Sequence, residues 1–357
     1  MAKDYKTELE SFLEIVGENN ASDLHLTVGK HPNIRVDGRL RDLSKYPVLT
    51  KEYAEGLINS LLSEEQKTKL SELREIDFSY SYQDKSRFRI NVFHQKGCLS
   101  AALRFLPSKI RTVKQLNLPS IIEKFAAHSQ GFFLVVGPTS HGKTTTLAAM
   151  IDYINHNTSK HIVTIEDPIE YIFNQDKCII EQREVGFDTI SFDRALRSAL
   201  RQDPDVIMLG EMRDLETIST ALTAAETGHL VLATLHTNNA AQTIDRIIDI
   251  FPAESKNQVR SQLAASLLGI VSQRLVPRAD FGRIPAVEIL VANSAIRNLI
   301  REGKIYQIDL VIETSVEEGM VSLNRFLADL VQRKEISMET ALNYSLNASD
   351  LRMLIGG

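Results

Sequence analysis

The sequence has few cysteines and no long apolar stretch, and both shortages exclude classes of protein. Its two cysteines, Cys98 and Cys178, are far apart in the chain, so they form no CxxC pair and no zinc module. We expect two reduced, packed thiols of a cytosolic protein. No run approaches the roughly 18 apolar residues of a membrane span. The first ten residues are polar, unlike a signal peptide. We therefore expect a cytoplasmic protein that does not insert into a membrane and that needs a partner to hold it at one.

An excess of basic residues is also absent. The 357 residues include 41 Lys and Arg against 46 Asp and Glu, which gives a formal net charge of -5. A protein that coats nucleic acid needs a concentrated basic surface, so we expect no nucleic-acid partner. Hydrophobic residues make up 43% and charged residues 24%, as in ordinary globular proteins. The length is sufficient for two domains.

Residues 1–106 have the pattern of a small mixed α/β domain. Helices are expected over 5–19 and 52–73. Strands are expected over 23–28, 33–36, 76–82, 88–92 and 99–105, with a hairpin turn at Asp37-Gly38. Alternation in the last three strands indicates a sheet with one packed face and one free face. Residues 107–119, with a proline at each end, are predicted to be a linker.

The pattern changes over residues 120–357. Continuous apolar runs at 132–136, 161–165, 206–209 and 230–233 alternate with helical patterns at 144–154, 192–201 and 215–227. Apolar strands separated by helices predict an α/β fold whose parallel sheet is covered on both faces. After residue 240 the chain is predicted to be mainly helical, over 242–251, 254–274, 295–302, 323–334 and 338–344.

The most specific motif is Gly137-Pro138-Thr139-Ser140-His141-Gly142-Lys143-Thr144, which fits GxxxxGK[ST] between a strand and a helix. Glycine lets backbone N–H groups curl around an anion, and the helix that follows points its positive end at it. Lys143 would reach the β- and γ-phosphates, and the Thr144 hydroxyl would bind Mg²⁺. We count the next residue, Thr145, in the same nucleotide site. The predicted ligands are ATP and Mg²⁺.

A second candidate is Glu211, which follows the buried run 206–209. Taken alone, a carboxylate at the end of a strand is usually solvated. Beside a P-loop in a parallel sheet, it suits the general base that activates the attacking water, and it would hold Mg²⁺ through water. We favour this catalytic interpretation.

Two further segments also follow or flank strands. Residues 164–170 place three carboxylates after a strand, among them Glu166, which would ligate Mg²⁺ through water or share the base role; an acidic capping loop is the alternative.

His229 and His236 bracket the run 230–233. No nearby Cys or third His completes a zinc site. The two histidines are either structural or sense the γ-phosphate, and the sequence does not choose between these.

In this order, the four elements resemble the Walker A loop, the Asp box, the Walker B strand and the His box of the type II/type IV secretion ATPase family. The likeness covers nearly the whole chain. The stretches 21–26, 210–214 and 295–302 add to it, and the last two resemble the branch of the family that retracts type IV pili. Where the family loop usually carries Gly-Ser, this chain has Ser140-His141.

The resemblance implies an N-terminal PAS-like domain joined to a RecA-like P-loop core with a helical C-terminal part. It implies a homohexameric ring whose ATP hydrolysis drives pilus disassembly, retraction and twitching motility. The implied place is the cytoplasmic face of the inner membrane, as a peripheral protein. The implied partners are a pilus platform protein of that membrane and a second retraction ATPase. The family also uses arginines of the small domain at the nucleotide, which gives Arg89 and Arg104 a catalytic role as arginine fingers. Surface ion pairs are the alternative for both.

Three rival functions are less well supported. An extension or secretion ATPase of the family usually carries a CxxC zinc insertion and extra N-terminal domains, which we do not find in this sequence. A nucleic-acid motor on the same fold would need aromatic and basic stripes. A regulator that binds ATP without hydrolysing it is the third alternative, and a hydrolysis measurement separates it from a motor.

Overall fold

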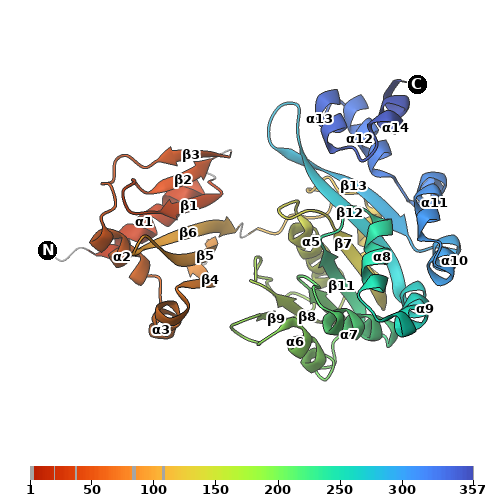
Figure 1. The fold of residues 1–357 in the computed structure, drawn as a ribbon, viewed down its shortest axis with the longest axis horizontal. Helices are drawn as coiled ribbons and strands as arrows, with labels where there is room; N and C mark the ends of the chain where they lie inside the picture. Colours follow the sequence, from red (N-terminus) through yellow and green to blue (C-terminus); the bar gives the residue numbers. More distant parts are fainter. Residues whose placement is uncertain (1–3, 20, 37, 83–85, 107–108, 357) are drawn as a thin grey trace. The chain divides into compact units, whose positions relative to one another are not determined.

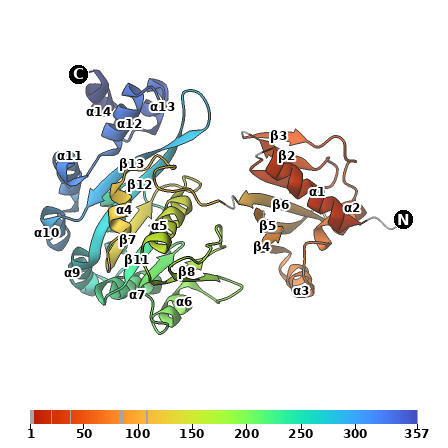
Figure 2. The same cartoon turned by 180° about the vertical axis from the view of Figure 1, so that it is seen from behind.

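The computed structural model describes residues 4–19, 21–36, 38–82, 86–106 and 109–356. They form two compact units, which are described separately (Figures 1 and 2). Unit 1 comprises Met1–Lys109 and Pro168–Ile172, and unit 2 comprises Ile110–Asp167 and Phe173–Gly357. Within the predicted linker 107–119, Pro107 and Ser108 lie outside the described residues. Both cysteines are free thiols; Cys178 is buried and Cys98 half-buried.

Unit 1 is built on an antiparallel sheet with strand order β3-β2-β1-β6-β5-β4. The strands are β1 Asp23–Leu26, β2 Asn33–Val36, β3 Arg39–Asp42, β4 Glu75–Tyr82, β5 Ser86–Gln95 and β6 Cys98–Leu106. The helices are α1 Tyr5–Glu18, α2 Lys51–Asn59 and α3 Glu64–Leu73. One apolar cluster joins both kinds of element, with Phe12 of α1, Leu57 of α2 and Phe88 of β5 fully buried in it.

Two expectations for unit 1 need comment. The single helix predicted over 52–73 is wrong, because the chain forms α2 and α3 with a break between them. At the break, the Ser63 hydroxyl accepts from the Gln66 N–H at 3.2 Å, and the Gln66 side chain accepts from the Ser63 N–H at 2.9 Å. This capping box starts a new helix. In the predicted turn, Asp37 lies outside the described residues, and Gly38 has the expected positive φ of 78°.

Unit 2 is built on a sheet with strand order β13-β12-β7-β11-β10-β8-β9. The strands are β7 Gly131–Val136, β8 His161–Glu166, β9 Ile179–Glu184, β10 Val206–Leu209, β11 Leu230–Leu235, β12 Leu267–Pro277 and β13 Arg283–Val291. The pairs from β12 through β9 are parallel, and β13 is an antiparallel edge strand. The predicted α/β class with a parallel-sheet core is confirmed, and the β13 edge is an addition to it.

Helices cover both faces of this sheet. They are α4 Ile121–Ala126, α5 Lys143–Asn157, α6 Phe192–Ala199, α7 Leu215–Glu226, α8 Ala240–Asp249, α9 Lys256–Ser266, α10 Ser294–Glu302, α11 Ile308–Thr314, α12 Leu323–Gln332, α13 Met338–Tyr344 and α14 Ala348–Gly356. Phe132 and Leu134 of β7 pack in one cluster with α7, α8 and α9. Phe133 points to the other face, where its ring lies 4.7 Å from that of Phe125 on α4. Figure 1 shows α7, α8 and α9 on one side, and Figure 2 shows α4 and α5 on the other. This double cover explains why all six residues of β7 are buried.

The helix predicted over 254–274 is wrong in its second half. Helix α9 ends at Ser266 and strand β12 begins at Leu267. A short apolar run fits a buried strand as well as a buried helix, and here long-range pairing decides: β12 pairs with β7 on one side and with β13 on the other. Among the described residues, no helix combines the length and apolarity needed to cross a bilayer.

Arg297 of α10 explains how α9 can end so sharply. Its guanidinium donates to the carbonyl oxygens of Ala264, Ala265 at 2.8 Å and Leu267 at 2.8 Å, and to that of Ala292 at 2.9 Å. The last carbonyls of a helix have no partner within it, and a cation placed there satisfies them. Arg297 therefore links α10 to the end of α9, a contact that we call the clamp.

Replacing Arg297 with Met is expected to destabilise unit 2 by about 2–4 kcal/mol, because several charge-assisted hydrogen bonds are lost at once. The matched control is Arg301→Met. Among the described residues, the Arg301 guanidinium bonds only within its own helix, to the Arg297 carbonyl at 3.3 Å and the Asn298 side chain at 2.9 Å. Thermal unfolding and hydrogen exchange of α9 measure the difference. Equal stability of the two variants would contradict the clamp.

Candidate active site

The predicted site residues meet at one edge of the sheet in unit 2. Strands β7, β11, β10 and β8 are parallel neighbours, so their carboxyl ends lie side by side. The loop 137–142 follows β7, Glu166 ends β8, Glu211 follows β10, and His236 follows β11. Four segments that are far apart in the sequence are thus brought to the same place.

The loop after β7 has the backbone that its glycines make possible. Gly137 has φ 141°, and a Cβ there would lie 2.3 Å from the Gln273 carbonyl oxygen. Gly142 has φ 82° and begins α5. The first α5 turn closes with the Thr146 N–H on the Gly142 carbonyl at 3.0 Å. The N–H groups before that point have no acceptor within the helix, which makes this end of α5 suited to bind a phosphate.

Lys143 is the buried cation of the site, with 7% of its surface exposed. Its ammonium donates to the Gly137 carbonyl at 2.9 Å and the Pro138 carbonyl at 3.0 Å, both in its own loop. It also lies 3.3 Å from Nδ1 of His236. These contacts hold the ammonium at the centre of the loop. Phosphate oxygens would be stronger partners for the same ammonium.

His236 connects Lys143 with Glu211. Because an ammonium only donates, Nδ1 of His236 accepts from Lys143 and the ring proton is on Nε2. Nε2 lies 3.0 Å from Oε1 of Glu211, to which it donates. The Thr139 hydroxyl is also 3.3 Å from Nδ1. A continuous chain of hydrogen bonds thus runs from the P-loop lysine through one imidazole to the carboxylate after β10.

Glu211 is an ionised carboxylate. Burial acts to raise its pKa, but the hydrogen bond from Arg213 and the neighbouring His236 outweigh burial and hold the pKa below its usual range. Arg213 donates to Oε2 at 2.7 Å. An ionised carboxylate can accept a proton from water or hold a water bound to Mg²⁺.

The segment Gly210–Asp214 is ordered for reasons that the sequence partly shows. The Gly210 Cα approaches β8 so closely that an added Cβ would lie 3.3 Å from the Glu166 Cα. Asp214 caps α7 and accepts from the Thr217 N–H at 2.7 Å. Arg213 was not among the predicted site residues, although a basic residue two positions after the predicted base is a signal that could have found it.

Glu166 is buried at the end of β8, with 3% of its surface exposed. Its Oε1 accepts from the Thr164 hydroxyl at 2.6 Å and from the Gln182 amide at 3.2 Å. It lies at the same edge of the sheet as Glu211. Its role as a second base, or as a ligand of Mg²⁺ through water, stays a prediction.

His229 does not join the site of this chain. It precedes β11, whereas His236 follows it, so the two histidines lie at opposite ends of a strand of six residues. Nδ1 of His229 is 2.9 Å from the Ala224 carbonyl at the end of α7. The prediction that groups His229 with the nucleotide-binding residues is corrected by this separation: a fully extended strand cannot bring both of its ends to one ligand.

Gln273 and His141 connect the P-loop to β12, and Gln273 was not among the predicted site residues. The Gln273 amide donates to the His141 carbonyl at 2.9 Å and accepts from the Thr146 hydroxyl at 2.7 Å. Nδ1 of His141 accepts from the Leu275 N–H at 2.9 Å. His141 is therefore half-buried and anchors the loop to β12. Gln273 was hidden because β12 was taken for a helix; a glutamine inside an apolar strand is the signal.

Replacing His141 with Ala is expected to weaken ATP binding about fivefold, because one hydrogen bond that positions the loop, worth ~1 kcal/mol, is lost. Burial, and then the charges of Arg274, Lys143 and Arg283, hold the pKa of His141 below 6.5. As the pH falls, His141 binds a proton in the unfolded chain before it does so in the folded chain. The contribution of neutral His141 to the free energy of unfolding is therefore complete above pH 6.5, and it is lost as the pH falls through the lowered pKa.

The measurement is the Kd for ATP between pH 5 and 8. The control is His141→Asn, whose amide oxygen accepts a hydrogen bond without titrating. The wild type should lose affinity in acid more steeply than this variant. Parallel pH profiles would show that His141 does not hold the loop.

Arg89 and Arg104 lie on strands β5 and β6 of unit 1. They are opposite each other in the β5–β6 register, whereas Phe88, Ile90 and Leu103 are fully buried. The Arg104 Nε donates to Asp23 at 3.0 Å, and the Arg104 side chain is 59% exposed. An ion pair this exposed contributes little to stability, so Arg104 can exchange this partner for another. Action of either arginine on a nucleotide stays a prediction.

The residues present fit ATP with Mg²⁺. The loop offers N–H groups and one ammonium to phosphates, and Thr144 and Glu211 offer a hydroxyl and a carboxylate. Among the described residues, no three His, Cys, Asp or Glu side chains come together to hold a metal by themselves.

Comparison with known proteins decides the family. The family model for type II/IV secretion system proteins matches residues 5–283. The chain belongs to this family. The predicted resemblance to this family and the predicted class of P-loop ATPase are confirmed, whereas the roles of the individual motif residues stay predictions.

Relatives of this secretion-family chain include proteins of type IV pili. It is 47% identical to the pilus retraction ATPase PilT of Pseudomonas aeruginosa, over 94% of this chain and 97% of that protein. It is 46% identical to a twitching motility protein of Neisseria gonorrhoeae, over 90% and 86% of the two chains. A crystal structure of the pilus retraction motor PilT with bound ADP superposes with a TM-score of 0.91 at 48% identity, covering 96% of this chain and 98% of the other.

Proposed function

We propose that the chain is an ATP-hydrolysing motor that powers retraction of type IV pili by driving pilus disassembly, which gives twitching motility. It works as a homohexamer with Mg²⁺, as a peripheral protein at the cytoplasmic face of the inner membrane. Its partners are a pilus platform protein in that membrane and a second retraction ATPase. The similarity over 97% of PilT and 86% of a twitching motility protein supports this proposal.

The observation that carries the enzymatic part is the chain of hydrogen bonds from Lys143 through His236 to Glu211. Lys143 donates to two carbonyls of its own loop, and it turns toward phosphates when a nucleotide is present. Nδ1 of His236 then loses its charged donor and keeps the Thr139 hydroxyl as a neighbour. Of the two alternatives for His236, we favour sensing of the γ-phosphate over a structural role, because the same ring is hydrogen-bonded to Glu211.

The roles of the remaining residues follow from their positions. The loop N–H groups bind the phosphates, the Thr144 hydroxyl binds Mg²⁺, and Glu211 orients and deprotonates the attacking water. Mg²⁺ supplies charge neutralisation at the phosphates when bound. Glu166 supports Glu211, and Arg89 and Arg104 stabilise charge across a domain or subunit boundary, as arginine fingers do.

Two measurements test the proposal together. The purified wild type should hydrolyse ATP, and the gene should restore twitching to a strain that lacks its own retraction ATPase. Absence of hydrolysis by the wild type would favour the inactive regulator. Strong stimulation of hydrolysis by single-stranded DNA would favour a nucleic-acid motor. Restored pilus extension without retraction would favour the extension branch.

A further inference from the structure

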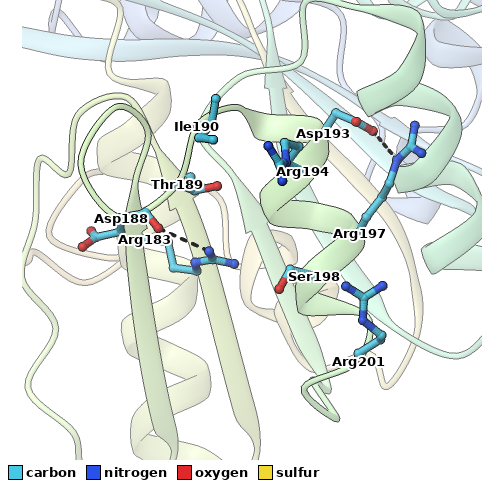
Figure 3. A pocket seen from close by; sticks show the side chains of 9 residues that line it. All are labelled: Arg183, Asp188, Thr189, Ile190, Asp193, Arg194, Arg197, Ser198 and Arg201. Atoms are coloured by element: carbon cyan, nitrogen blue, oxygen red, sulfur yellow. Dashed lines mark hydrogen bonds and ion pairs between the residues drawn. The ribbon is translucent and has the colours of Figure 1, made fainter.

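A second concave site lies in unit 2, between β9 and α6. It is a pocket of about 550 Å³ whose lining includes Arg183, Arg194, Arg197 and Arg201. Figure 3 shows Arg183 reaching from β9 toward α6, which carries Arg194 and Arg197. Residues of the P-loop and the catalytic carboxylates are not part of this lining. The role of the pocket is therefore separate from that of the nucleotide site.

The arginines gather for a simple geometric reason. Arg194, Arg197 and Arg201 are three and four positions apart and so share one face of the helical segment, whereas Ala195 and Leu196 on the other face are fully buried. Arg183 is fixed against this face, because its guanidinium donates to the Asp188 carbonyl at 3.3 Å and to the Ala195 carbonyl at 3.5 Å.

The positive charge of the pocket is only partly neutralised. Arg197 pairs with Asp193 at 2.7 Å. Asp188 uses its carboxylate to accept from the Glu184 N–H at 2.8 Å. In the described part of the chain, no carboxylate forms an ion pair with Arg194 or Arg201. Like charges three or four positions apart on a helix repel one another, so an anion that enters the pocket is favoured.

Exposed apolar side chains lie on the loop that borders the pocket. Ile190, which lines the pocket, is 74% exposed, and Phe187 on the same loop is 81% exposed. A solvated arginine face has no need of such residues, whereas exposed apolar groups beside a charged pocket are typical of interaction surfaces. The surface is therefore complementary to a ligand that carries both acidic and apolar groups.

We propose that this arginine pocket, with Ile190 in its lining and Phe187 exposed on the same loop, is the docking site for an acidic, partly apolar segment of the protein on which the motor pulls. The proposal rests on the proposed function. Guanidinium groups match carboxylates in paired hydrogen bonds, and a concave pocket suits side chains better than a flat lipid surface. A small phosphate compound would use the arginines but not Phe187.

The direct test uses a fluorescein-labelled peptide of alternating Glu and Leu as the probe, with fluorescence anisotropy of the full chain. Arg194→Glu with Arg201→Glu should weaken binding at least about 30-fold, because two attractive charges become repulsive. Phe187→Ser with Ile190→Ser should weaken it about tenfold. The matched control is Arg246→Glu with Arg325→Glu, which makes the same change of charge at two other exposed arginines and should bind as the wild type does.

Three outcomes would overturn the proposal. The first is no binding of the peptide by the wild type. The second is binding that inorganic pyrophosphate abolishes and that the Phe187 and Ile190 changes leave intact, which would assign a small phosphate ligand. The third is arginine-dependent binding to phosphatidylglycerol vesicles without peptide binding, which would assign a lipid surface.

A second readout separates this proposal from the proposed function. Basal ATP hydrolysis should be unchanged in all three double variants, since none of these residues belongs to the nucleotide site. Twitching should be lost in the arginine and apolar variants and kept in the control. Hydrolysis by the wild type with normal twitching in every variant would overturn the docking site alone. A wild type without hydrolysis would overturn the motor itself.

Discussion

Replacing Lys143 with Ala should leave a folded protein that neither holds ATP tightly nor hydrolyses it. The ammonium is the one side-chain cation that the structure places inside the P-loop, within 3.0 Å of the Gly137 and Pro138 carbonyls. Loss of a charge that stabilises the transferred phosphoryl group costs at least about 100-fold in turnover. Steady-state hydrolysis measures the rate, and the thermal shift on adding ATP with Mg²⁺ measures binding.

The control for this variant is Lys256→Ala, which removes a lysine whose ammonium pairs with Asp249 at 2.6 Å on the surface. It should hydrolyse ATP at the rate of the wild type. The Lys143 variant should unfold at nearly the temperature of the unliganded wild type, but without the rise in temperature that ATP gives the wild type. Normal turnover would overturn the assignment of the nucleotide site.

Glu211→Gln should retain ATP without turning it over. The amide has the shape of the carboxylate and still accepts from Nε2 of His236, so the geometry around Lys143 is preserved. It cannot take a proton from water, and loss of a general base costs about 10²- to 10⁴-fold. Filter binding after a brief exposure should recover intact ATP from the variant and ADP from the wild type.

Glu216→Gln is the matched control, because Glu216 is an exposed carboxylate in the first turn of the neighbouring helix α7. Its turnover should equal that of the wild type. If Glu211→Gln loses less than about tenfold and Glu166→Gln loses far more, the base is the carboxylate at the end of β8. The two carboxylates are therefore distinguished by the same assay.

The sequence predicts those parts of the fold that local pattern controls. The P-loop and the four apolar runs can each be recognised within about a dozen residues. Because the carboxyl ends of parallel strands meet at one edge of a sheet, these segments then place Lys143, Glu166, Glu211 and His236 close together. The alternation of buried and free positions along β4, β5 and β6 was predicted from an equally short pattern. In each case a short local pattern determines where a strand lies in the sheet or to which face its side chains point.

The parts that escaped prediction depend on partners far away in the chain. Residues of β12 form a strand because β7 and β13 pair with them on either side. The pattern of residues 254–274 alone gives no information about these two partners. His229 was grouped with His236 because both flank one strand, and the length of that strand separates them. The anchor role of His141 needs the Leu275 N–H, which lies on the strand that was misassigned.

The contacts of β12 have a mechanical consequence. Gln273 grips the P-loop, and the adjacent residue, Arg274, donates to the Tyr344 carbonyl at 3.4 Å, where α13 ends. One peptide bond thus separates the attachment of the nucleotide loop from the attachment of the C-terminal helices. Because neighbouring residues of a strand point to opposite faces, β12 links the P-loop on one face to the end of α13 on the other.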